Sequence, residues 1–392
     1  MNVDPLNVVD LLAELISRPS LNPGDTDDPS LVGEERVAAF IDDHLQQRGF
    51  ITERIPYEPG RDNVIARFNP ADGRAPERVM MIEGHMDTVA VDGMVVPPFE
   101  ATRRNGRVYG RGACDTKGPT AAALAAFTPR VLDAARASRR GLMYVAACAE
   151  EKGLLGSVAL ADAGLGADEA IILEPTELVP VIAHKSSLWF DIQLIGRACH
   201  GSEPENGVNA VEAGAELLRF LREDFRFSLD APNALLGHNT YNVGKFQGGR
   251  AANIVPGSCA IEIDLRTIPG EDNQALQDQI RQFLNAMKSE GRVVDYLFKP
   301  AATPSFSTDP QSELVQRMER ATRDVCGRSV EPVGTAWMSD ASPLSKTCSE
   351  IAVFGPGSIR QAHTKDEYIE IAELERGVAV FEAIYLDFLC SG

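Results

Sequence analysis

The stretch RVMMIEGHMD, residues 78–87, decides the fold, because an apolar run of strand length ends there in His85 and Asp87. Two further apolar runs, LMYVAACA at 142–149 and EAIILEP at 169–175, have the same character. Short apolar runs bounded by glycine, proline or charge are typical of strands that are buried on both faces of a sheet. The three runs therefore predict a central sheet that is covered on both sides.

Helical patterns surround these strands. Alanine-rich segments at 120–136 and 154–163 lie between the apolar runs, and amphipathic helices are expected at Val8–Ile16 and near 34–47. Strand and helix thus alternate along this part of the chain. Such alternation is the pattern of an α/β domain with helices on the faces of its sheet.

The pattern of apolar and polar residues changes after the third apolar run. Strands with alternating polarity and two helices there indicate a compact α+β unit. Its strands are expected at 187–196, 240–247 and 259–268, and its helices at 209–222 and Asn273–Ser289. A proline-rich stretch, KPAATPSFSTDP at 299–310, follows, and the apolar IAVFGPG at 351–357 then resumes the α/β character. We therefore predict a split α/β domain with helices on both faces of a mixed sheet, residues 1–183 and 297–392, and an inserted α+β domain at 184–296.

The charge balance excludes several classes of partner. The 392 residues carry 38 Lys and Arg against 57 Asp and Glu, and the net charge of −19 repels nucleic-acid phosphates and anionic lipid. Asp4 and Asp10 interrupt the first apolar pattern, so no signal peptide is expected, and no apolar run reaches the roughly 20 residues of a membrane helix. Seven scattered cysteines without a C-x-x-C pair argue against disulfides or a thiolate zinc site. We expect a cytoplasmic protein with no nucleic-acid or membrane partner.

Side chains that can bind a metal ion follow each apolar segment. In an open α/β sheet the ligand crevice lies outside the carboxyl ends of the strands, so these groups are expected to converge. Asp115, in the glycine-rich loop GRGACDTKG, adds a carboxylate near the same edge. The strand-end candidates are His85 and Asp87, Glu150 and Glu151, Glu174, and His363.

This ligand set points to zinc, because two imidazoles with several carboxylates suit that ion, with cobalt or manganese as substitutes. The set exceeds what one ion needs, and a shared carboxylate can hold two ions about 3.5–4 Å apart, for which Asp115 is the candidate bridge. Asp87 is placed to accept a hydrogen bond from the second ring nitrogen of His85. Of the adjacent Glu150 and Glu151, one is expected to bind metal and the other to abstract a proton from water.

The ordered motifs GHMDTV, YGRGACDTKG, ACAEEKGLLGS, ILEPTEL and FGPGSIRQAHTKDE resemble those of the M20 family of dinuclear zinc aminoacyl hydrolases. The branch of acetylornithine deacetylases and succinyl-diaminopimelate desuccinylases is the most similar. The resemblance covers nearly the whole chain, because ACHGSEPENGVNAVE, GGRAANIVPGSC and DLRTIPG in the insert also match the dimerisation or lid domain of the family. It implies a homodimer with two Zn²⁺ per subunit that hydrolyses the amide bond of a small N-acyl amino acid.

The resemblance also implies a role for each residue around the metals. The implied ligands are His85 and Glu174 for one ion, Glu151 and His363 for the other, and Asp115 as the bridge. Glu150 then becomes the general base. The family pattern further implies a cis peptide bond between Asp115 and Thr116.

Three residues of the inserted domain are implied in handling the substrate. His200 matches a histidine that in relatives reaches the active site of the other subunit and stabilises the developing oxyanion. Asn253 and Arg266 resemble positions that hold polar groups of the substrate, and a guanidinium suits a carboxylate because the two groups pair through two hydrogen bonds.

One departure from the family pattern bears on the acyl group. The segment GTAWMSDASPLS at 334–345 has Ser342 and Pro343 where many desuccinylase-like members carry an arginine. GPGSIRQAHTKDE is close to the acetylornithine deacetylase form, so N-acetyl-L-ornithine is the expected substrate. The alternatives within the family are another N-acyl-amino-acid deacylase, succinyl-diaminopimelate desuccinylase, and a dipeptidase or carboxypeptidase.

Two alternatives come from other classes of protein. A nucleotide-dependent enzyme is disfavoured because YGRGACDTKG matches neither of the common glycine-rich nucleotide-binding motifs. A catalytically silent metal-binding protein is disfavoured because the chain keeps the complete set of ligands together with the base.

Overall fold

The computed structural model describes residues 7–391, so Asp4 lies outside the described part of the chain. The chain divides into two compact units. The first comprises the described residues up to Ile182, together with Ser307–Gly334 and the segment from Ser339 onward, and the second comprises Ala183–Phe306 and Thr335–Met338. Within residues 7–391, no helix is long and apolar enough to cross a bilayer.

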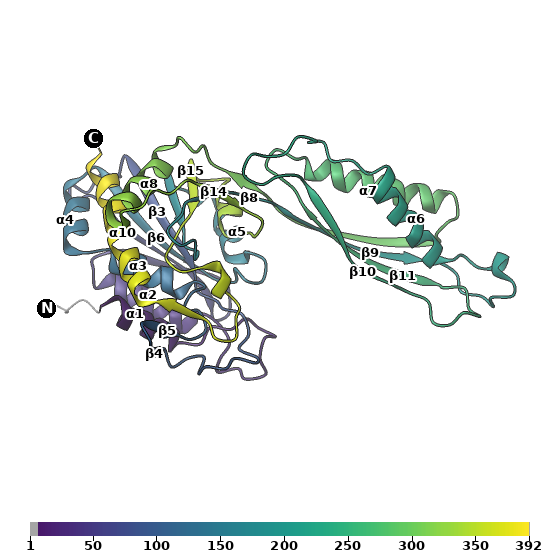
Figure 1. Ribbon diagram of the computed structural model, residues 1–392, viewed down its shortest axis with the longest axis horizontal. Helices are drawn as coiled ribbons and strands as arrows, with labels where there is room; N and C mark the ends of the chain where they lie inside the picture. Colours follow the sequence, from purple (N-terminus) through teal and green to yellow (C-terminus); the bar gives the residue numbers. More distant parts are fainter. Residues whose placement is uncertain (1–6, 392) are drawn as a thin grey trace. The chain divides into compact units, whose positions relative to one another are not determined.

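A mixed sheet forms the centre of the first unit (Figure 1). Its strands are β1 (Ile51–Glu58), β2 (Arg61–Phe68), β3 (Arg78–His85), β6 (Arg140–Ala147), β7 (Glu169–Ile172), β8 (Val181–His184), β13 (Phe306–Ser307), β14 (Val333–Thr335) and β15 (Glu350–Val353). The order is β1-β2-β6-β3-β7-β15-β8-β13, with β14 beside β8. The four strands β6, β3, β7 and β15 run parallel to one another, whereas β2 pairs antiparallel with β6 and β8 antiparallel with β15. The carboxyl ends of the four parallel strands therefore lie at one edge.

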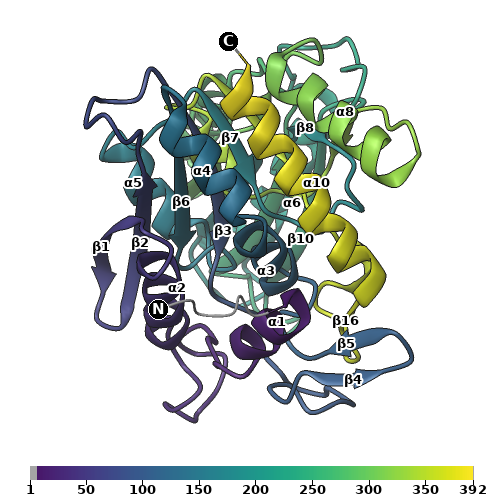
Figure 2. The same ribbon diagram turned by 90° about the vertical axis from the view of Figure 1, so that its left-hand side faces the viewer.

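Helices cover both faces of this sheet, as the sequence predicts. The helices are α1 (Val8–Ile16), α2 (Glu35–Gln46), α3 (Lys117–Ala125), α4 (Pro129–Ala137), α5 (Leu155–Asp162), α8 (Glu313–Cys326), α9 (Ala341–Leu344) and α10 (Ile371–Cys390). Figure 2 shows α10 between α3, α4 and α8, which pack together with α1 and α2 on one face. In Figure 1, α5 lies across β3 and β6 from these helices, and α9 packs against α5 and β15. A small sheet of β4 (Thr102–Arg104), β5 (Arg107–Tyr109) and β16 (Tyr368–Glu370) completes the unit.

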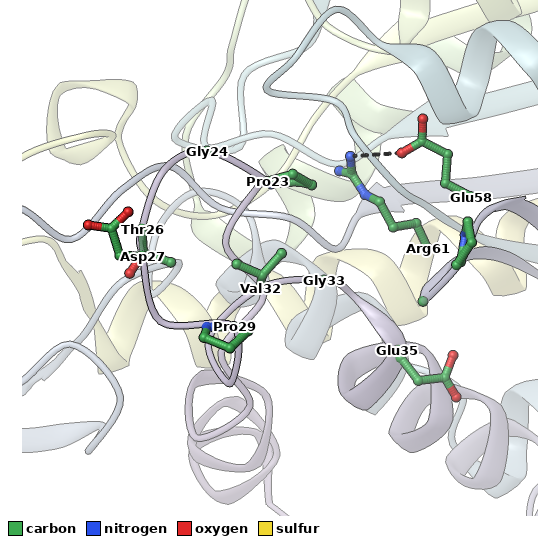
Figure 3. Close-up of a pocket in the computed structure, with 12 residues that line it drawn as sticks. Pro23, Gly24, Thr26, Asp27, Pro29, Val32, Gly33, Glu35, Glu58 and Arg61 are labelled. Carbon is green, nitrogen blue, oxygen red and sulfur yellow. Dashed lines mark ion pairs between the residues drawn. The ribbon is translucent and has the colours of Figure 1, made fainter.

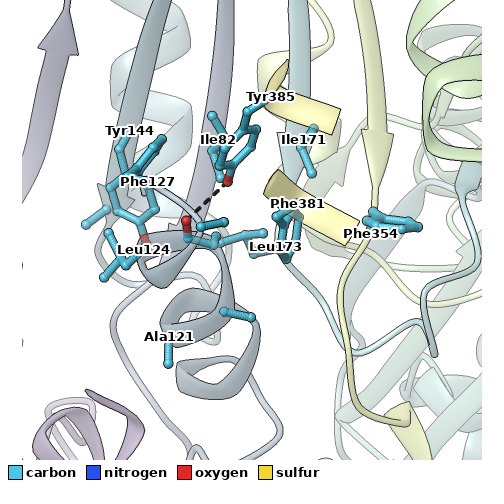
Figure 4. Close-up of a cluster of buried hydrophobic side chains, with 14 of the residues drawn as sticks. Ile82, Ala121, Leu124, Phe127, Tyr144, Ile171, Leu173, Phe354, Phe381 and Tyr385 are labelled. Atoms are coloured by element: carbon cyan, nitrogen blue, oxygen red, sulfur yellow. Dashed lines mark hydrogen bonds between the residues drawn. The ribbon is translucent and has the colours of Figure 1, made fainter. Parts of the chain in front are cut away.

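The main hydrophobic core lies between the sheet and the layer that contains α3 and α10 (Figure 4). Phe127 stacks on Tyr385 with the ring centroids 5.1 Å apart. The hydroxyl group of Tyr385 donates a hydrogen bond of 3.3 Å to the carbonyl oxygen of Ala123, so the buried phenol is satisfied. Ile82 of β3 and Phe381 of α10 are fully buried in the same cluster. Full burial of each such side chain contributes about 1.5–3 kcal/mol, and this packing fixes the strands whose ends carry the polar side chains.

The helical segment expected at 120–136 is two helices. Thr128 accepts a hydrogen bond from the backbone N–H of Val131, and Pro129 occupies the first turn of α4. A side-chain cap followed by proline is a strong start signal, so α3 ends before Phe127 and a new helix begins at Pro129. The helix expected at Val8–Ile16 is confirmed at those bounds.

The second unit is an antiparallel sheet covered on one face by α6 (Ala210–Glu223) and α7 (Asn273–Ser289). Its strands are β9 (Ser187–Ile195), β10 (Thr240–Gly248), β11 (Ser258–Arg266) and β12 (Asp295–Thr303), in the order β10-β11-β9-β12. The sequence-based boundary at 296 cuts through β12, and the proline-rich stretch begins inside this strand. Pro300 lies opposite Phe190 in the β12–β9 pair. The sheet tolerates this proline because β12 is an edge strand, where a missing N–H costs no ladder bond.

Candidate metal centre

The side chains predicted to bind metal come together at the carboxyl ends of the parallel strands. His85 is the last residue of β3, and Glu150 and Glu151 follow the end of β6 at Ala147. His85 pairs with Ala147 in the β3–β6 register. Glu174 comes two residues after β7, and His363 lies in the loop that follows β15. The parallel register therefore brings residues from distant parts of the chain to one edge.

A first group of ligands consists of His85, Asp115 and Glu174, whose ligand atoms lie within 4.8 Å of one another. Nε2 of His85 is 3.2 Å from Oδ1 of Asp115 and 3.9 Å from Oε1 of Glu174. All three residues are buried. Burial, together with the negative charge of Asp115, raises the pKa of Glu174 well above its usual range.

A second group consists of Asp115, Glu151 and His363, again with ligand atoms within 4.8 Å of one another. Nε2 of His363 lies 3.0 Å from Oε1 of Glu151 and 3.3 Å from Oδ2 of Asp115. Hydrogen bonds to these two carboxylates raise the pKa of His363 to about 10. Burial alone would raise the pKa of Asp115, but its hydrogen bonds with His363 and His85 outweigh that effect and hold the pKa below its usual range.

The two groups share Asp115, and each uses a different oxygen of its carboxylate. Glu150 does not belong to either group, although it lies with His85 and Glu151 in a third cluster of the same size. Burial raises the pKa of Glu150 well above its usual range, the charge of His85 lowers it, and the neighbouring Glu151 raises it further. Glu150 is thus a basic carboxylate beside the two ligand groups.

These residues suit a pair of divalent cations. The donors are imidazole nitrogens and carboxylate oxygens, which zinc binds in proteins. Several carboxylates lie close together in a buried setting, where mutual repulsion and desolvation disfavour their charged forms. Two cations held by the groups that share Asp115 would remove this penalty, and each group would contribute one imidazole.

Asp87 does more than the sequence predicts. The second ring nitrogen of His85, Nδ1, lies 3.0 Å from the backbone oxygen of Asp87 and 3.5 Å from its carboxylate oxygen Oδ1. The nearer acceptor of the ring N–H is therefore the backbone carbonyl group. The carboxylate of Asp87 also accepts hydrogen bonds from the backbone N–H groups of Glu150 and Glu151, at 3.0 and 3.1 Å. Asp87 thus links the end of β3 to the turn that follows β6.

Glu367 holds the loop of Asp115, a role that was not predicted from the sequence. One oxygen of its carboxylate accepts from Nη1 of Arg111 at 2.7 Å and from the N–H of Gly112 at 3.1 Å. The other accepts from the N–H groups of Cys114 and Asp115 at 2.8 and 3.0 Å. The only signal was its position four residues after His363, within the motif FGPGSIRQAHTKDE. The Asp115–Thr116 peptide bond is cis, which confirms the expectation for this bond.

The second unit carries the three residues expected to contact substrate. His200 is exposed, and its Nδ1 lies 2.7 Å from the hydroxyl oxygen of Ser202. Asn253 is also exposed, and its carbonyl oxygen accepts a hydrogen bond of 2.8 Å from the N–H of Gly201, the neighbour of His200. Arg266 at the end of β11 pairs with Asp264 at 3.0 Å. His200 and Asn253 thus share one loop region, whereas Arg266 is engaged by a carboxylate of its own strand.

Comparison with known proteins gives concordant matches. The sequence model described as Peptidase family M20/M25/M40 matches residues 81–387. An acetylornithine deacetylase of Myxococcus xanthus is 34% identical over 370 residues, which cover 89% of this chain and 90% of that protein. A metallo-carboxypeptidase of the M20 family from Sulfolobus solfataricus has a similar structure, with a TM-score of 0.77, 19% identity, and coverage of 98% of this chain and 100% of that one. A Bacillus subtilis protein described as a dinuclear metal-binding M20 peptidase matches with a TM-score of 0.71, 15% identity, and coverage of 97% of both chains.

Proposed function

The chain belongs to peptidase family M20/M25/M40, and from this membership we propose that it is a dinuclear zinc amidohydrolase that releases the acyl group of an N-acyl amino acid. We propose N-acetyl-L-ornithine as the substrate, because the relative from Myxococcus xanthus with which it shares 34% identity is named an acetylornithine deacetylase. The proposal includes a cytoplasmic homodimer with one such centre in each subunit.

The observation that carries this proposal is the shared carboxylate of Asp115. Its two oxygens face two different imidazoles, at 3.2 Å from Nε2 of His85 and 3.3 Å from Nε2 of His363. Glu174 joins the first imidazole and Glu151 the second, so each proposed ion has one imidazole, one carboxylate of its own and one oxygen of the bridge. Cobalt or manganese would be accepted by the same donors.

Two zinc ions held by these residues would supply Lewis-acid polarisation of the scissile carbonyl group and would lower the pKa of a water molecule at the site. Glu150 takes the proton of the attacking water on a carboxylate oxygen and transfers it to the leaving amine. Glu150 suits this step because it is a buried carboxylate that lies beside both ligand groups without belonging to either of them. Asp87 holds the imidazole of His85 and the backbone of Glu150 in place.

The second unit has a proposed role in recognising the substrate. His200 donates a hydrogen bond to the developing oxyanion, and Asn253 and Arg266 hold polar groups of the substrate. For Arg266, this requires that its pairing with Asp264 leave donors for a substrate carboxylate. The guanidinium group has five N–H donors, and the contact with Asp264 is made by Nε.

A neutral acetyl group suits the segment after Ser339 better than a succinyl group does. In the structure Ser342 and Pro343 are buried in the short helix α9. This helix therefore presents no arginine for a second carboxylate, such as that of a succinyl group.

The test is hydrolysis of a panel of N-acetyl, N-succinyl and N-formyl amino acids and dipeptides, on enzyme that is first stripped of metal and then reloaded with zinc or cobalt. We expect metal-dependent turnover with the highest kcat/KM for N-acetyl-L-ornithine. A different best substrate would correct the proposed specificity alone. Absence of metal-dependent hydrolysis across the panel would overturn the proposed function and favour a silent metal-binding protein.

A further inference from the structure

Two buried carboxylates hold three consecutive backbone N–H groups at the start of the turn that carries Glu150 and Glu151. Oε1 of Glu34 accepts from the N–H of Ala149 at 3.0 Å. Oδ1 of Asp87 accepts from the N–H of Glu150 at 3.0 Å, and Oδ2 accepts from that of Glu151 at 3.1 Å. Both carboxylates are fully buried. The two carboxylates thus fix the backbone of the turn that carries the proposed base, Glu150, and the proposed ligand, Glu151.

One hydrogen-bonded bridge joins these two carboxylates. Arg61 donates to Glu34 from Nη2 at 2.7 Å and from Nε at 2.9 Å. Nη2 of Arg61 also donates to Oδ1 of Asn22 at 2.5 Å, and Nδ2 of Asn22 donates to Oδ2 of Asp87 at 2.8 Å. Since an arginine only donates and a carboxylate only accepts, the Asn22 amide satisfies both neighbours in a single orientation. The bridge therefore has one defined geometry.

The bridge is shielded from solvent except near the guanidinium group. Asn22 is fully buried and Arg61 is 5% exposed. Arg61 lies at the wall of a surface hollow of about 590 Å³ formed by the loop around Pro23 and the turn between β1 and β2 (Figure 3). Its Nη1 forms an ion pair with the exposed Glu58 at 3.9 Å, and Figure 3 marks this pair with a dashed line. Charged hydrogen bonds in such a buried setting are stronger and more sharply directed than a surface ion pair.

Asp87 is the point where this bridge meets the metal centre. Asp87 accepts hydrogen bonds from the turn of Glu150 and Glu151. Its backbone oxygen and its Oδ1 also lie close to Nδ1 of His85. A shift of Asp87 would therefore displace a proposed metal ligand on β3 and the proposed base at the same time. Because a misplacement of about 1 Å at a reacting group can cost about 100-fold in rate, the anchoring of Asp87 bears on turnover.

We propose that Asn22 and Arg61 are positioning residues for the hydrolysis. By fixing Asp87 and Glu34, they hold the ring of His85 and the Ala149–Glu151 turn in one arrangement. This inference rests on the proposed function. Within residues 7–391 neither side chain bonds directly to a proposed metal ligand, so Asn22 acts through Asp87 and Arg61 acts through Glu34 and Asn22.

The decisive variant is Asn22→Leu, which keeps the approximate shape of the side chain and removes the two hydrogen bonds that Asn22 makes in the bridge. We expect kcat to fall 10- to 100-fold, KM to change less than about threefold, and the affinity for Co²⁺ to fall at least about 10-fold, the range typical of residues that orient a metal ligand. The visible absorption spectrum of the cobalt-loaded enzyme should shift as well, because it reports ligand geometry. Asn22→Ser serves if the leucine variant does not melt cooperatively.

Ser20→Ala is the matched control. Ser20 is fully buried two residues from Asn22, and its hydroxyl has no hydrogen-bond partner among the described residues. We expect this control to keep the kcat and the cobalt spectrum of the unmodified enzyme. Asn22 variants that lower only the melting temperature, with kcat and cobalt spectrum unchanged, would overturn the proposal and leave a purely structural bridge. If the unmodified enzyme hydrolyses no substrate of the panel, the proposed function fails, and the cobalt affinity and spectrum still decide the positioning role.

Discussion

Nε2 of His363 lies 3.3 Å from Oδ2 of Asp115, which leaves the other oxygen, Oδ1, to the imidazole of His85. A carboxylate that divides its two oxygens between two imidazoles is suited to bridge two cations, since each oxygen then faces one ion. Asp115 therefore matters to both proposed ions, whereas every other proposed ligand matters to one.

Replacement of this bridge is expected to remove more metal than replacement of any other ligand. An amide offers only one good metal-binding oxygen, so Asp115→Asn should lower the zinc content from about two ions to fewer than one per chain. Glu174→Gln should leave about one. Atomic emission spectroscopy after dialysis measures both values. Two ions retained by the Asp115 variant would contradict the assignment of the bridge.

Glu150 and Glu151 should separate catalysis from metal binding. Because Glu150 lies outside the two groups that share Asp115, Glu150→Gln is expected to keep both ions and to lose about 10²–10⁴-fold in kcat, the usual contribution of a general base. Glu151→Gln should lose metal affinity first, and its activity should partly return at high zinc concentration. Steady-state kinetics and metal titration on the same preparations provide the comparison, and equal metal loss in both variants would refute this division of roles.

Glu367 should contribute strongly to stability although it touches no proposed ion. Its carboxylate pairs with Arg111 and accepts from the backbone around Asp115. Glu367→Gln places an amide N–H against one of these donors and leaves the buried Arg111 without its counter-charge, so we expect a loss of about 3 kcal/mol in the free energy of unfolding. Urea denaturation of the metal-free protein measures this loss.

The control for Glu367 is Glu370→Gln, in the same strand region. Glu370 pairs with Arg107 at 2.7 Å, but both side chains are more than a third exposed. An exposed pair of this kind contributes about 0–1 kcal/mol. A similar loss in both variants would show that the buried contacts of Glu367 carry no special weight.

His44 should make the protein sensitive to acid. It is buried in α2, its Nε2 has no hydrogen-bond partner within residues 7–391, and burial, with a smaller effect from the charge of Arg48, lowers its pKa to about 3. The unfolded chain keeps a pKa of about 6.5, so below that pH the unfolded state binds more protons and the stability falls as the pH falls. Between pH 6.5 and pH 5, the free energy of unfolding of the unmodified protein should fall by about 2 kcal/mol more than that of His44→Leu. Urea denaturation at the two pH values measures this difference. Parallel pH profiles of the two proteins would contradict this expectation.

The strand-end side chains could be found from the sequence because local features mark them. Each follows an apolar run, and parallel strands bring their carboxyl ends to one edge of a sheet, so the convergence of His85 with Glu174 follows from topology alone. The helices were predictable for a similar reason, since an amphipathic pattern such as that of Val8–Ile16 has one way to bury its apolar face.

The residues that hold the centre in place could not be found in this way. Asn22 lies in a turn-rich loop and Arg61 at the start of an antiparallel strand, and neither position shows a pattern that points to a site. Their contacts join segments far apart in the sequence, as in the hydrogen bond between Asn22 and Asp87. The strand β12 could not be predicted for a different reason. Its prolines resemble those of a linker unless the strand is known to lie at the edge of a sheet.

The position of β15 has a consequence for folding of the chain during its synthesis on the ribosome. Although Glu350–Val353 is the last strand of the large sheet along the chain, it lies between β7 and β8 in that sheet. Until it emerges, the apolar strand β7 has no neighbour on that side, and His363 has not yet been synthesised. A nascent chain that stalls before residue 350 would expose the unpaired edge of β7. Unpaired apolar strands of this kind are prone to aggregation and are bound by chaperones. Completion of the large sheet and synthesis of the proposed ligand His363 would then both await the same final stretch of translation.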